Sequence, residues 1–353
     1  MPNVDQDRLR DLRERFVADF GATLQAANVV IGDRLGLYAG LAALGPSTPR
    51  ELAAATATHE RYVGEWLLGQ VAGGYVSRQP ESGRFFLSAE QALLLANEAG
   101  PLSVPGAFQL ATACVKDEAA LAEAFLTGDG VPWHQHHEDV FEGCERFSRS
   151  LYGADLVSNW IPLLDGVMEK LGAGARVADV GCGHGAPALM MARAFPESIF
   201  VGFDCHVRSV EWAGKTAAFA GLADRVSFEV ASTHDFPGRD YDLVTTFHCL
   251  HDLGDPIGAA RHIRSALVPG GTWMIVEPYA TDSVDGNLTP LGRAFYNLST
   301  LLCVPSALSQ KGGMALGAQA GEAKLRRVVQ AGGFTSVRKV TASDFNLVLE
   351  ARA

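Results

Sequence analysis

The sequence predicts an α/β protein in which a doubly wound, mostly parallel sheet follows a mostly helical N-terminal domain. From about residue 155 onward, β-like runs such as RVADV alternate with amphipathic helical segments, a pattern that is typical of a parallel sheet. A glycine-rich turn, GCGHGA, directly follows the first of these runs. Two adjacent β-like runs, TSVRKV and FNLVLEA, end the chain, and we expect them to form an antiparallel hairpin at the edge of the sheet.

The N-terminal domain, which we place at residues 1–98, has the element order of a winged helix. Residues 5–44 carry apolar side chains at helical spacing. The segment STPRELAAAT then predicts a helix start, with Thr48 as the cap, Pro49 at the first helical position and Glu51 closing a capping box. A further helix and two short β-like runs around a Pro-Glu-Ser-Gly turn complete the pattern.

The helix expected over residues 60–73 is the one that reads DNA in DNA-binding winged helices. Its charged residues are Glu60, Arg61 and Glu65, and most of the others are apolar or small. A helix that reads DNA needs Lys and Arg on its exposed face. We therefore expect this domain to mediate dimerisation rather than DNA binding.

Composition limits the partners and the location of the protein. The chain has 353 residues, enough for two domains, and its net charge of −11 argues against nucleic acid as the main partner. The six cysteines form no Cys-x-x-Cys pair, which argues against a disulfide framework and a structural zinc site. The N-terminal segment lacks the apolar core of a signal peptide, and the most apolar early run contains Asp33 and Arg34. We expect a cytoplasmic protein without a membrane segment.

The turn GCGHGA fits two kinds of cofactor, because it satisfies the dinucleotide pattern and also suits S-adenosylmethionine. Asp179, two residues before Gly181, favours the second. A carboxylate at the end of the strand repels a pyrophosphate but attracts the ammonium and sulfonium groups of S-adenosylmethionine. Asp204, at the end of the run IFVGFD, suits the ribose hydroxyls of either cofactor.

With these residues the sequence resembles the class I S-adenosylmethionine-dependent methyltransferases over about residues 155–353. The resemblance implies a Rossmann-like sheet with an antiparallel last strand, and S-adenosyl-L-homocysteine as the product. The alternative is another nucleotide-binding Rossmann protein. The cofactor-binding residues implied by the resemblance are Asp179, Gly181, Cys182, Gly183, Gly185, Asp204, Cys205, Ser232, Thr233, Phe247 and His248.

The segment FHCLHDLGDPIGAARHIRSALVPGGTWMIVEP is similar to the core of small-molecule O-methyltransferases, in which Leu-His-Asp precedes a helix and Pro-Gly-Gly precedes a strand. Such enzymes, including bacterial two-domain members of unestablished substrate, carry an N-terminal winged-helix dimerisation domain, so a homodimer is implied. The family's general base falls on His251, and histidine suits this role near neutral pH. Its two flanking acids fall on Glu277 and on Gln319, which carries no charge. His248 is a second candidate base.

The acceptor side of the site is expected in two segments. Residues 99–154 are predicted as a helical linker and substrate lid, in which PWHQHHED places Trp133 and His134 against the substrate. Contiguous histidines are a poor ligand set for magnesium or zinc, so no metal site is expected. Residues 280–316 are predicted to cap the active site. The candidate substrate residues are Trp133, His134, Tyr279, Tyr296 and Gln319.

The sequence therefore predicts an S-adenosylmethionine-dependent methyltransferase that acts on a small, largely apolar or aromatic acceptor, with oxygen as the expected methylated atom. Two alternatives stay open. One is a winged-helix transcriptional regulator that binds S-adenosylmethionine as a signal. The other is a member of the fold that no longer methylates, because Gln319 stands where the family has an acid.

Overall fold

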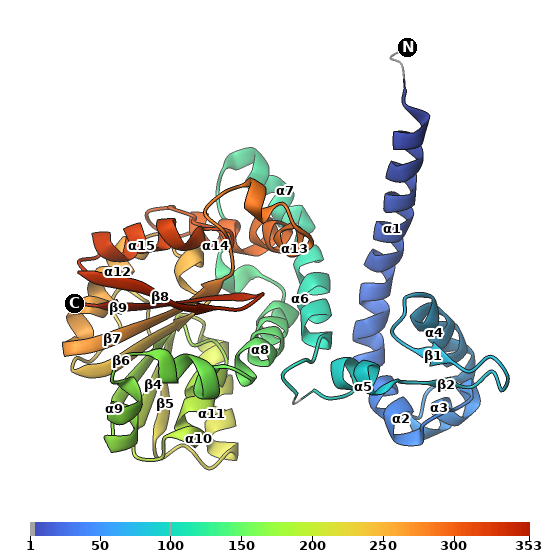
Figure 1. Cartoon of the computed structure of the whole chain (residues 1–353), viewed down its shortest axis with the longest axis horizontal. Helices are drawn as coiled ribbons and strands as arrows, with labels where there is room; N and C mark the ends of the chain where they lie inside the picture. Colours follow the sequence, from blue (N-terminus) through green and yellow to red (C-terminus); the bar gives the residue numbers. More distant parts are fainter. Residues whose placement is uncertain (1–3, 99) are drawn as a thin grey trace. The chain divides into compact units, whose positions relative to one another are not determined.

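The computed structural model describes residues 4–98 and 100–353, and the chain divides into two compact units, Met1–Thr112 and Ala113–Ala353. The first unit is a winged helix preceded by a long helix (Figure 1). Gly36, with a φ of 67°, separates the first two helices, so the stretch expected over residues 5–44 is not one helix. The elements up to the end of this unit are α1 (Gln6–Arg34), α2 (Leu37–Leu44), α3 (Pro49–Ala55), α4 (Glu60–Ala72), β1 (Ser77–Arg78), β2 (Phe85–Phe86), α5 (Ala89–Leu95) and α6 (Pro105–Val115).

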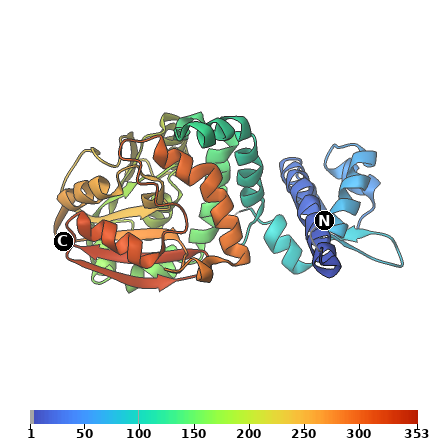
Figure 2. The same cartoon turned by 90° about the horizontal axis from the view of Figure 1, so that it is seen from above.

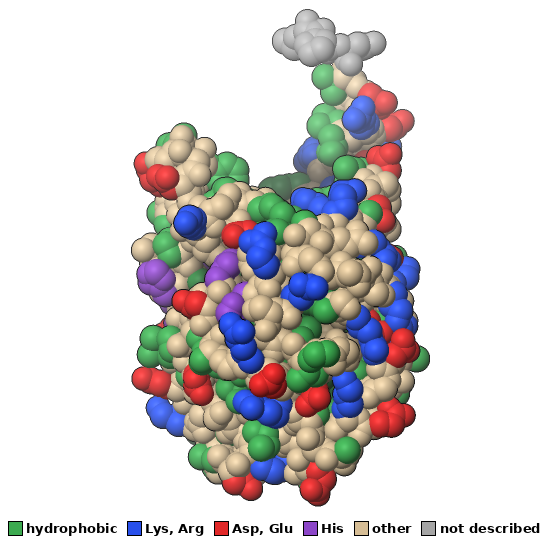
Figure 3. All heavy atoms as spheres, turned by 90° about the vertical axis from the view of Figure 1, so that its left-hand side faces the viewer, with side chains coloured by type: hydrophobic (Ala, Val, Ile, Leu, Met, Phe, Trp, Pro, Cys, Tyr) green, Lys and Arg blue, Asp and Glu red, His purple; other side chains and the backbone are tan. Residues whose placement is uncertain are grey.

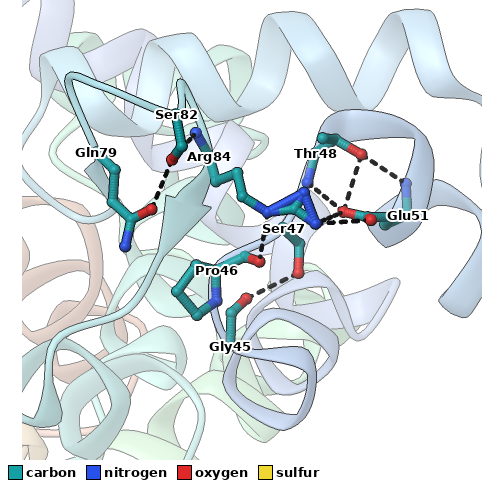
Figure 4. Close-up of polar contacts among 8 residues, drawn as sticks. All are labelled: Gly45, Pro46, Ser47, Thr48, Glu51, Gln79, Ser82 and Arg84. Atoms are coloured by element: carbon teal, nitrogen blue, oxygen red, sulfur yellow. Dashed lines mark hydrogen bonds and ion pairs between the residues drawn. The ribbon is translucent and has the colours of Figure 1, made fainter.

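An ion pair ties the wing, formed by β1 and β2, to the start of α3 (Figure 4). Arg84 donates to the two carboxylate oxygens of Glu51 at 2.7 and 2.8 Å, and to the Pro46 carbonyl at 3.1 Å. Glu51 Oε2 also accepts from the Thr48 N–H at 2.8 Å. The predicted capping box of Thr48 and Glu51 is thereby confirmed, and the same carboxylate connects it to the wing.

The second unit is a seven-stranded sheet with helices on both faces (Figure 1). The strand order is β5-β4-β3-β6-β7-β9-β8, and β9 is antiparallel to both of its neighbours. The predicted doubly wound sheet with an antiparallel last strand is confirmed. The strands are β3 (Arg176–Val180), β4 (Ile199–Asp204), β5 (Val226–Val230), β6 (Tyr241–Phe247), β7 (Leu267–Pro278), β8 (Ser336–Ala342) and β9 (Asn346–Arg352).

The last two strands form the expected antiparallel hairpin, and β8 lies at the edge of the sheet (Figure 2). The last strand, β9, is inserted between β8 and β7. The remaining elements of this unit are helical, namely α7 (Glu118–Thr127), η1 (Trp133–Gln135), α8 (Glu138–Gly153), η2 (Leu156–Trp160), η3 (Ile161–Leu163), α9 (Val167–Ala173), α10 (Ala186–Ala194), α11 (Val207–Phe219), η4 (Leu250–Asp252), α12 (Pro256–Ala266), η5 (Asp285–Asn287), α13 (Pro290–Leu298), η6 (Ser299–Cys303), α14 (Val304–Leu308) and α15 (Gly321–Ala331).

The central strands are apolar on both faces because helices cover both sides of the sheet. Along β6 and β7, Leu243 and Met274 point into one hydrophobic cluster, whereas Val244 and Trp273 point into the other. This alternation leaves the strand ends as the place where polar side chains gather. Within the described ranges, 4–98 and 100–353, no helix has both the length and the apolar character needed to cross a bilayer.

Candidate active site

Three parallel strands end side by side where the strand order of the sheet reverses. Strand β3 lies between β4 and β6, and Asp179 is in register with Gly202 on one side and Thr245 on the other. In doubly wound sheets ligands bind at this point, outside the carboxyl ends of the strands. The glycine turn after β3, Asp204 at the end of β4 and His248 after β6 therefore surround one site.

The glycine turn forms an open cradle. Gly181, Gly183 and Gly185 have φ angles of 74°, 52° and 79°, a region that other residues rarely adopt. A Cβ at Gly181 would lie 2.4 Å from Cys249 Sγ, whereas one at Gly183 would have no neighbour within 4 Å. The Gly181 N–H donates to the Phe203 carbonyl at 2.8 Å, which holds the turn against β4. The space beside the Cα of Gly183 is therefore open for a ligand to approach.

Asp179 presents a buried carboxylate oxygen without a partner. The residue is 1% exposed, and Thr245 Oγ1 donates to its Oδ1 at 2.9 Å. Its Oδ2 is buried and has no hydrogen-bond partner among the described residues. Burial raises the pKa of Asp179 to about 7. A lone carboxylate oxygen beside the glycine turn fits the ammonium group of a cationic ligand and would repel a pyrophosphate.

We expect Asp179→Asn to stabilise the ligand-free protein at about pH 8 and to have little effect at about pH 4. The folded protein raises the pKa of this carboxyl from 3.8 to about 7. The stability that the Asp179 carboxyl contributes is therefore fully present below its unfolded-state pKa and is lost as the pH rises through its folded-state pKa of about 7. The asparagine avoids the buried charge and still accepts from Thr245, so the gain at about pH 8 is roughly 2–4 kcal/mol. Urea unfolding at both pH values measures it, and a pH-independent difference would contradict the assignment.

Asp204 closes the glycine turn from the end of β4. Its Oδ2 accepts from the Gly183 N–H and its Oδ1 from the His206 N–H, both at 2.8 Å. Each carboxylate oxygen has lone pairs for a further hydrogen bond, so the pair is able to accept two hydroxyls of a ligand. Of the two predicted neighbours, Cys205 is exposed, whereas Cys182 is buried with its Sγ 3.8 Å from the Gly183 carbonyl.

The residues expected around an adenine lie at different depths. Ser232 and Thr233 are partly exposed in a turn after β5, where Asp235 Oδ1 accepts from the Ser232 N–H at 3.1 Å. Phe247 is 8% exposed and belongs to the core, with its ring centroid 5.0 Å from that of Tyr152. The turn after β5 is therefore partly exposed, whereas Phe247 belongs to a hydrophobic core cluster.

His251 lies in η4 between two carboxylates. Its Nδ1 is 2.5 Å from Glu277 Oε2, and its Nε2 is 3.0 Å from Asp252 Oδ1. Glu277 is 1% exposed and also accepts from the Leu250 N–H at 2.9 Å, which holds the carboxylate in place. Burial lowers the pKa of His251, but the charges of Asp252 and Glu277 outweigh burial and hold it well above its ordinary value.

The second acid beside His251 is Asp252, which the sequence analysis did not assign as a flanking acid. The Gln319 amide is used elsewhere, since its Nε2 donates to the Tyr279 and Ala318 carbonyls at 3.2 Å each. Adjacent side chains diverge in a regular helix or strand, and only the isolated turn of η4 lets those of His251 and Asp252 meet. Asp252, the residue that follows His251, thus supplies the negative charge that Gln319 lacks.

His248 has a strained backbone and a depressed pKa. Its φ is 49°, an uncommon value for a residue other than glycine. Its Nε2 lies 2.8 Å from Asn346 Oδ1 at the start of β9, so this nitrogen carries the proton that is donated to the amide oxygen. Burial lowers the pKa of His248 to about 4, so the ring is neutral at pH 7 and is a weaker base than His251.

The predicted lid segment packs near the end of β4. Trp133, in η1, has its ring centroid 5.5 Å from that of Phe141, which stacks on His206 at 4.1 Å. His206 follows Asp204 by two residues, so the aromatic stack lies beside the glycine turn and its acid. His134 is exposed on η1.

Part of the predicted capping segment lies over the turn that carries His251. After α14, Gln310 Nε2 donates to the Asp252 carbonyl at 2.9 Å, and its Oε1 accepts from the Gly254 N–H at 3.1 Å. Tyr279 and Tyr296 are 37% and 36% exposed, so their side chains lie at the surface of the unit. The sulfur of Cys303 lies close to both His251 and Asp252, and no local sequence pattern connects these residues.

Comparison with known families decides what this arrangement is. A model described as a methyltransferase domain matches residues 152–312, and one described as an Rv2258c-like winged HTH domain matches residues 22–97. Residues 152–312 are a methyltransferase domain. A curated relative, 27-O-demethylrifamycin SV methyltransferase of Amycolatopsis mediterranei, is 37% identical over 106 residues, which cover 30% of this chain. The chain spans 39% of the length of that relative.

Solved structures resemble this chain over nearly its whole length. Mitomycin 7-O-methyltransferase matches with a TM-score of 0.70 at 21% identity, over 98% of this chain and 100% of that one. Human N-acetylserotonin methyltransferase, solved in complex with SAM, matches with a TM-score of 0.70 at 18% identity, over 100% and 99% of the two chains. These likenesses show that the chain has the two-domain class I methyltransferase fold.

Proposed function

We propose that this methyltransferase uses S-adenosylmethionine and acts on a small, largely apolar or aromatic acceptor. The observation that carries the proposal is the unpartnered, buried carboxylate oxygen of Asp179 beside the glycine turn of a methyltransferase domain. Methyltransferases of the same fold solved with SAM or SAH support this cofactor. The proposed cofactor-binding residues are Asp179, Gly181, Cys182, Gly183, Gly185, Asp204, Cys205, Ser232, Thr233, Phe247 and His248.

The bound cofactor supplies an electrophilic methyl group on a sulfonium. An acceptor hydroxyl becomes a good nucleophile once it loses its proton, and His251 Nε2 is the proposed acceptor of that proton. Glu277 holds Nδ1 in the protonated tautomer and stabilises the imidazolium that forms. Asp252 adds a second negative charge at Nε2, so the neutral form that acts as the base is populated only above the raised pKa.

Oxygen is the proposed methylated atom, because neighbours of the same fold and a curated relative are named for O-methylation. An acceptor near the His251 turn would meet the lid and the capping segment. The proposed substrate residues are Trp133, His134, Tyr279, Tyr296 and Gln319.

Calorimetry with the full chain tests the cofactor first. S-adenosylhomocysteine should bind with micromolar affinity, and NADH should give no heat. Mass spectrometry of small-molecule extracts incubated with the protein and a deuterated methyl donor then identifies the acceptor by its mass shift. Binding of NADH without a response to S-adenosylhomocysteine would overturn the proposal.

We also propose that the protein is a cytoplasmic homodimer joined through its N-terminal unit. Helix α1 has an apolar stripe at helical spacing, in which Phe16, Phe20 and Leu24 are 65%, 56% and 54% exposed. A contiguous exposed stripe of this kind marks an interface with another chain. A second copy offers the same stripe, which suits a self-complementary contact between two α1 helices.

Phe16→Glu with Phe20→Glu should convert the dimer to a monomer, because each partner would then place charges in an apolar contact. Size-exclusion chromatography with light scattering measures the mass. Ala22→Glu is the matched control, because this exposed residue lies on the opposite face of α1 and should leave the dimer intact. A monomeric wild-type chain would contradict the proposal.

Nucleic acid is not a proposed partner. The face drawn in Figure 3 carries Lys and Arg side chains interspersed with Asp and Glu. In α4, Arg61 forms an ion pair with Glu65, and Tyr62 is 80% exposed. Phosphate binding needs a basic face, which this distribution of charges does not favour.

A further inference from the structure

Three metal-ligand side chains converge beside the candidate base. His251, Asp252 and Cys303 each offer one ligand atom, and these atoms all lie within 4.8 Å of one another. They come from two elements far apart in the sequence, the turn η4 and the π-helical turn η6. Among residues 4–98 and 100–353 no other group of three or more His, Cys, Asp and Glu side chains is close enough to share an ion.

His251 has the second contact that a metal-binding histidine usually has. Its Nε2 points at the cluster, and its Nδ1 is bonded to Glu277 Oε2 on the other side of the ring. Zinc-binding histidines almost always donate their remaining N–H to a carboxylate or carbonyl, which fixes the tautomer and the ring orientation. Glu277 is buried and held by backbone N–H groups, so the ring is already oriented for coordination.

Asp252 contributes a buried carboxylate oxygen to the cluster. Its Oδ1 is buried, accepts no hydrogen bond within the described residues, and lies 3.0 Å from His251 Nε2. Cys303 ends η6, and its side chain is buried on the cluster. Single π-helical turns occur often at functional sites, where they redirect a side chain. Two turns of irregular backbone therefore bring the nitrogen, oxygen and sulfur atoms together.

We propose that His251, Asp252 and Cys303 form a binding site for a thiophilic divalent cation of the zinc class. Zinc binds imidazole nitrogen, carboxylate oxygen and thiolate sulfur, whereas magnesium and calcium prefer oxygen ligands alone. Three protein ligands leave one coordination position open, as in sites where zinc also binds a water or a small molecule. The sequence analysis expected no metal because it considered the contiguous histidines of PWHQHHED, whereas Cys303 is 51 residues away from Asp252 in the sequence.

Cation binding and general-base catalysis use the same lone pair of His251 Nε2. A bound cation therefore removes the base, and methyl transfer should stop when the site is filled. This consequence rests on the proposed function, whereas binding of the cation does not. Binding must therefore be measured without turnover.

The test uses the chelator-treated full chain titrated with Co²⁺ and with Zn²⁺. Co²⁺ should give a sulfur-to-metal charge-transfer band at one equivalent, and calorimetry should show one Zn²⁺ per chain. Cys303→Ser should remove the band, and Asp252→Asn and Glu277→Gln should each weaken Zn²⁺ binding about 10- to 100-fold. Cys205→Ser is the control for an exposed thiol and should keep the band.

Circular dichroism and thermal melting establish that each variant is folded. If Cys303→Ser is unstable, Asp252→Asn is the variant to rely on, because it changes the side-chain volume least. Absence of a charge-transfer band in the wild-type chain would overturn the proposal. So would Zn²⁺ binding that survives Cys303→Ser and Asp252→Asn but is lost with His134→Ala, since the exposed lid histidine would then be the ligand. If the band appears but no acceptor is methylated, the metal site stands and the proposed function fails.

Discussion

Substituting His251 by glutamine should lower kcat by about 10²- to 10⁴-fold, the usual contribution of a general base. The affinity for S-adenosylhomocysteine should change little, because the proposed cofactor residues Asp179 and Asp204 lie on β3 and β4 and not on the turn that carries His251. The imidazole is oriented by Glu277 at Nδ1, which leaves its Nε2 facing Asp252 at 3.0 Å. Glutamine retains hydrogen bonding but cannot accept the proton.

His248→Asn tests the second candidate base. Asparagine tolerates the positive φ of this position better than most residues, so the backbone after β6 should be kept. Steady-state kinetics with the identified acceptor and calorimetry with S-adenosylhomocysteine separate kcat from binding. If His248→Asn lost more turnover than His251→Gln, the base would be His248.

The same site predicts a pH dependence. Asp252 and Glu277 hold the pKa of His251 well above its ordinary value, so its basic form appears only as the pH rises through that raised value. We therefore expect kcat to increase with pH above neutrality. Asp252→Asn should move the rising part of the plot of kcat against pH toward lower pH, because it removes one of the two negative charges that favour the imidazolium. If the rise of kcat with pH stayed at the same pH in Asp252→Asn, a group other than His251 would be responsible for it.

Asp204→Asn should weaken binding of S-adenosylhomocysteine by roughly 10²-fold. The carboxylate stands at the end of β4 and would accept the two ribose hydroxyls, and a hydrogen bond to a charged group contributes about 1.5–3 kcal/mol. The amide keeps one acceptor oxygen for the Gly183 or His206 N–H, so the turn should remain folded. Its nitrogen donates where the cofactor needs an acceptor.

Asp235→Asn is the matched control for Asp204→Asn. This carboxylate accepts from the Ser232 N–H in the turn after β5 and is exposed, so its loss should cost little affinity. Calorimetry at constant ionic strength compares the two variants, and thermal melting checks that both are folded. Equal affinities for the Asp204 and Asp235 variants would remove Asp204 from the cofactor site.

Most elements of the fold were predictable from local patterns. The capping box at Thr48 and Glu51 is set by residues three apart, so its signal is complete within one turn. The strands β3 and β4 are short apolar runs that end in the glycine turn and in Asp204. Both lie where the alternation of strand-like and helix-like segments in the sequence predicts them. The break at Gly36 was missed, because a single glycine within an apolar helical stretch does not by itself end a helix.

The chemistry of the site was predictable only where one segment contains it. The sequence by itself determined the glycine turn, the acids at two strand ends and His251, because each belongs to a local pattern. The tertiary structure alone decided that Asp179 Oδ2 is buried without a hydrogen-bond partner and that β9 lies between β7 and β8 in the sheet. It also decided that Asp252 and Cys303 meet at His251 Nε2. These contacts depend on packing between distant segments and on the exclusion of water, neither of which any local spacing encodes.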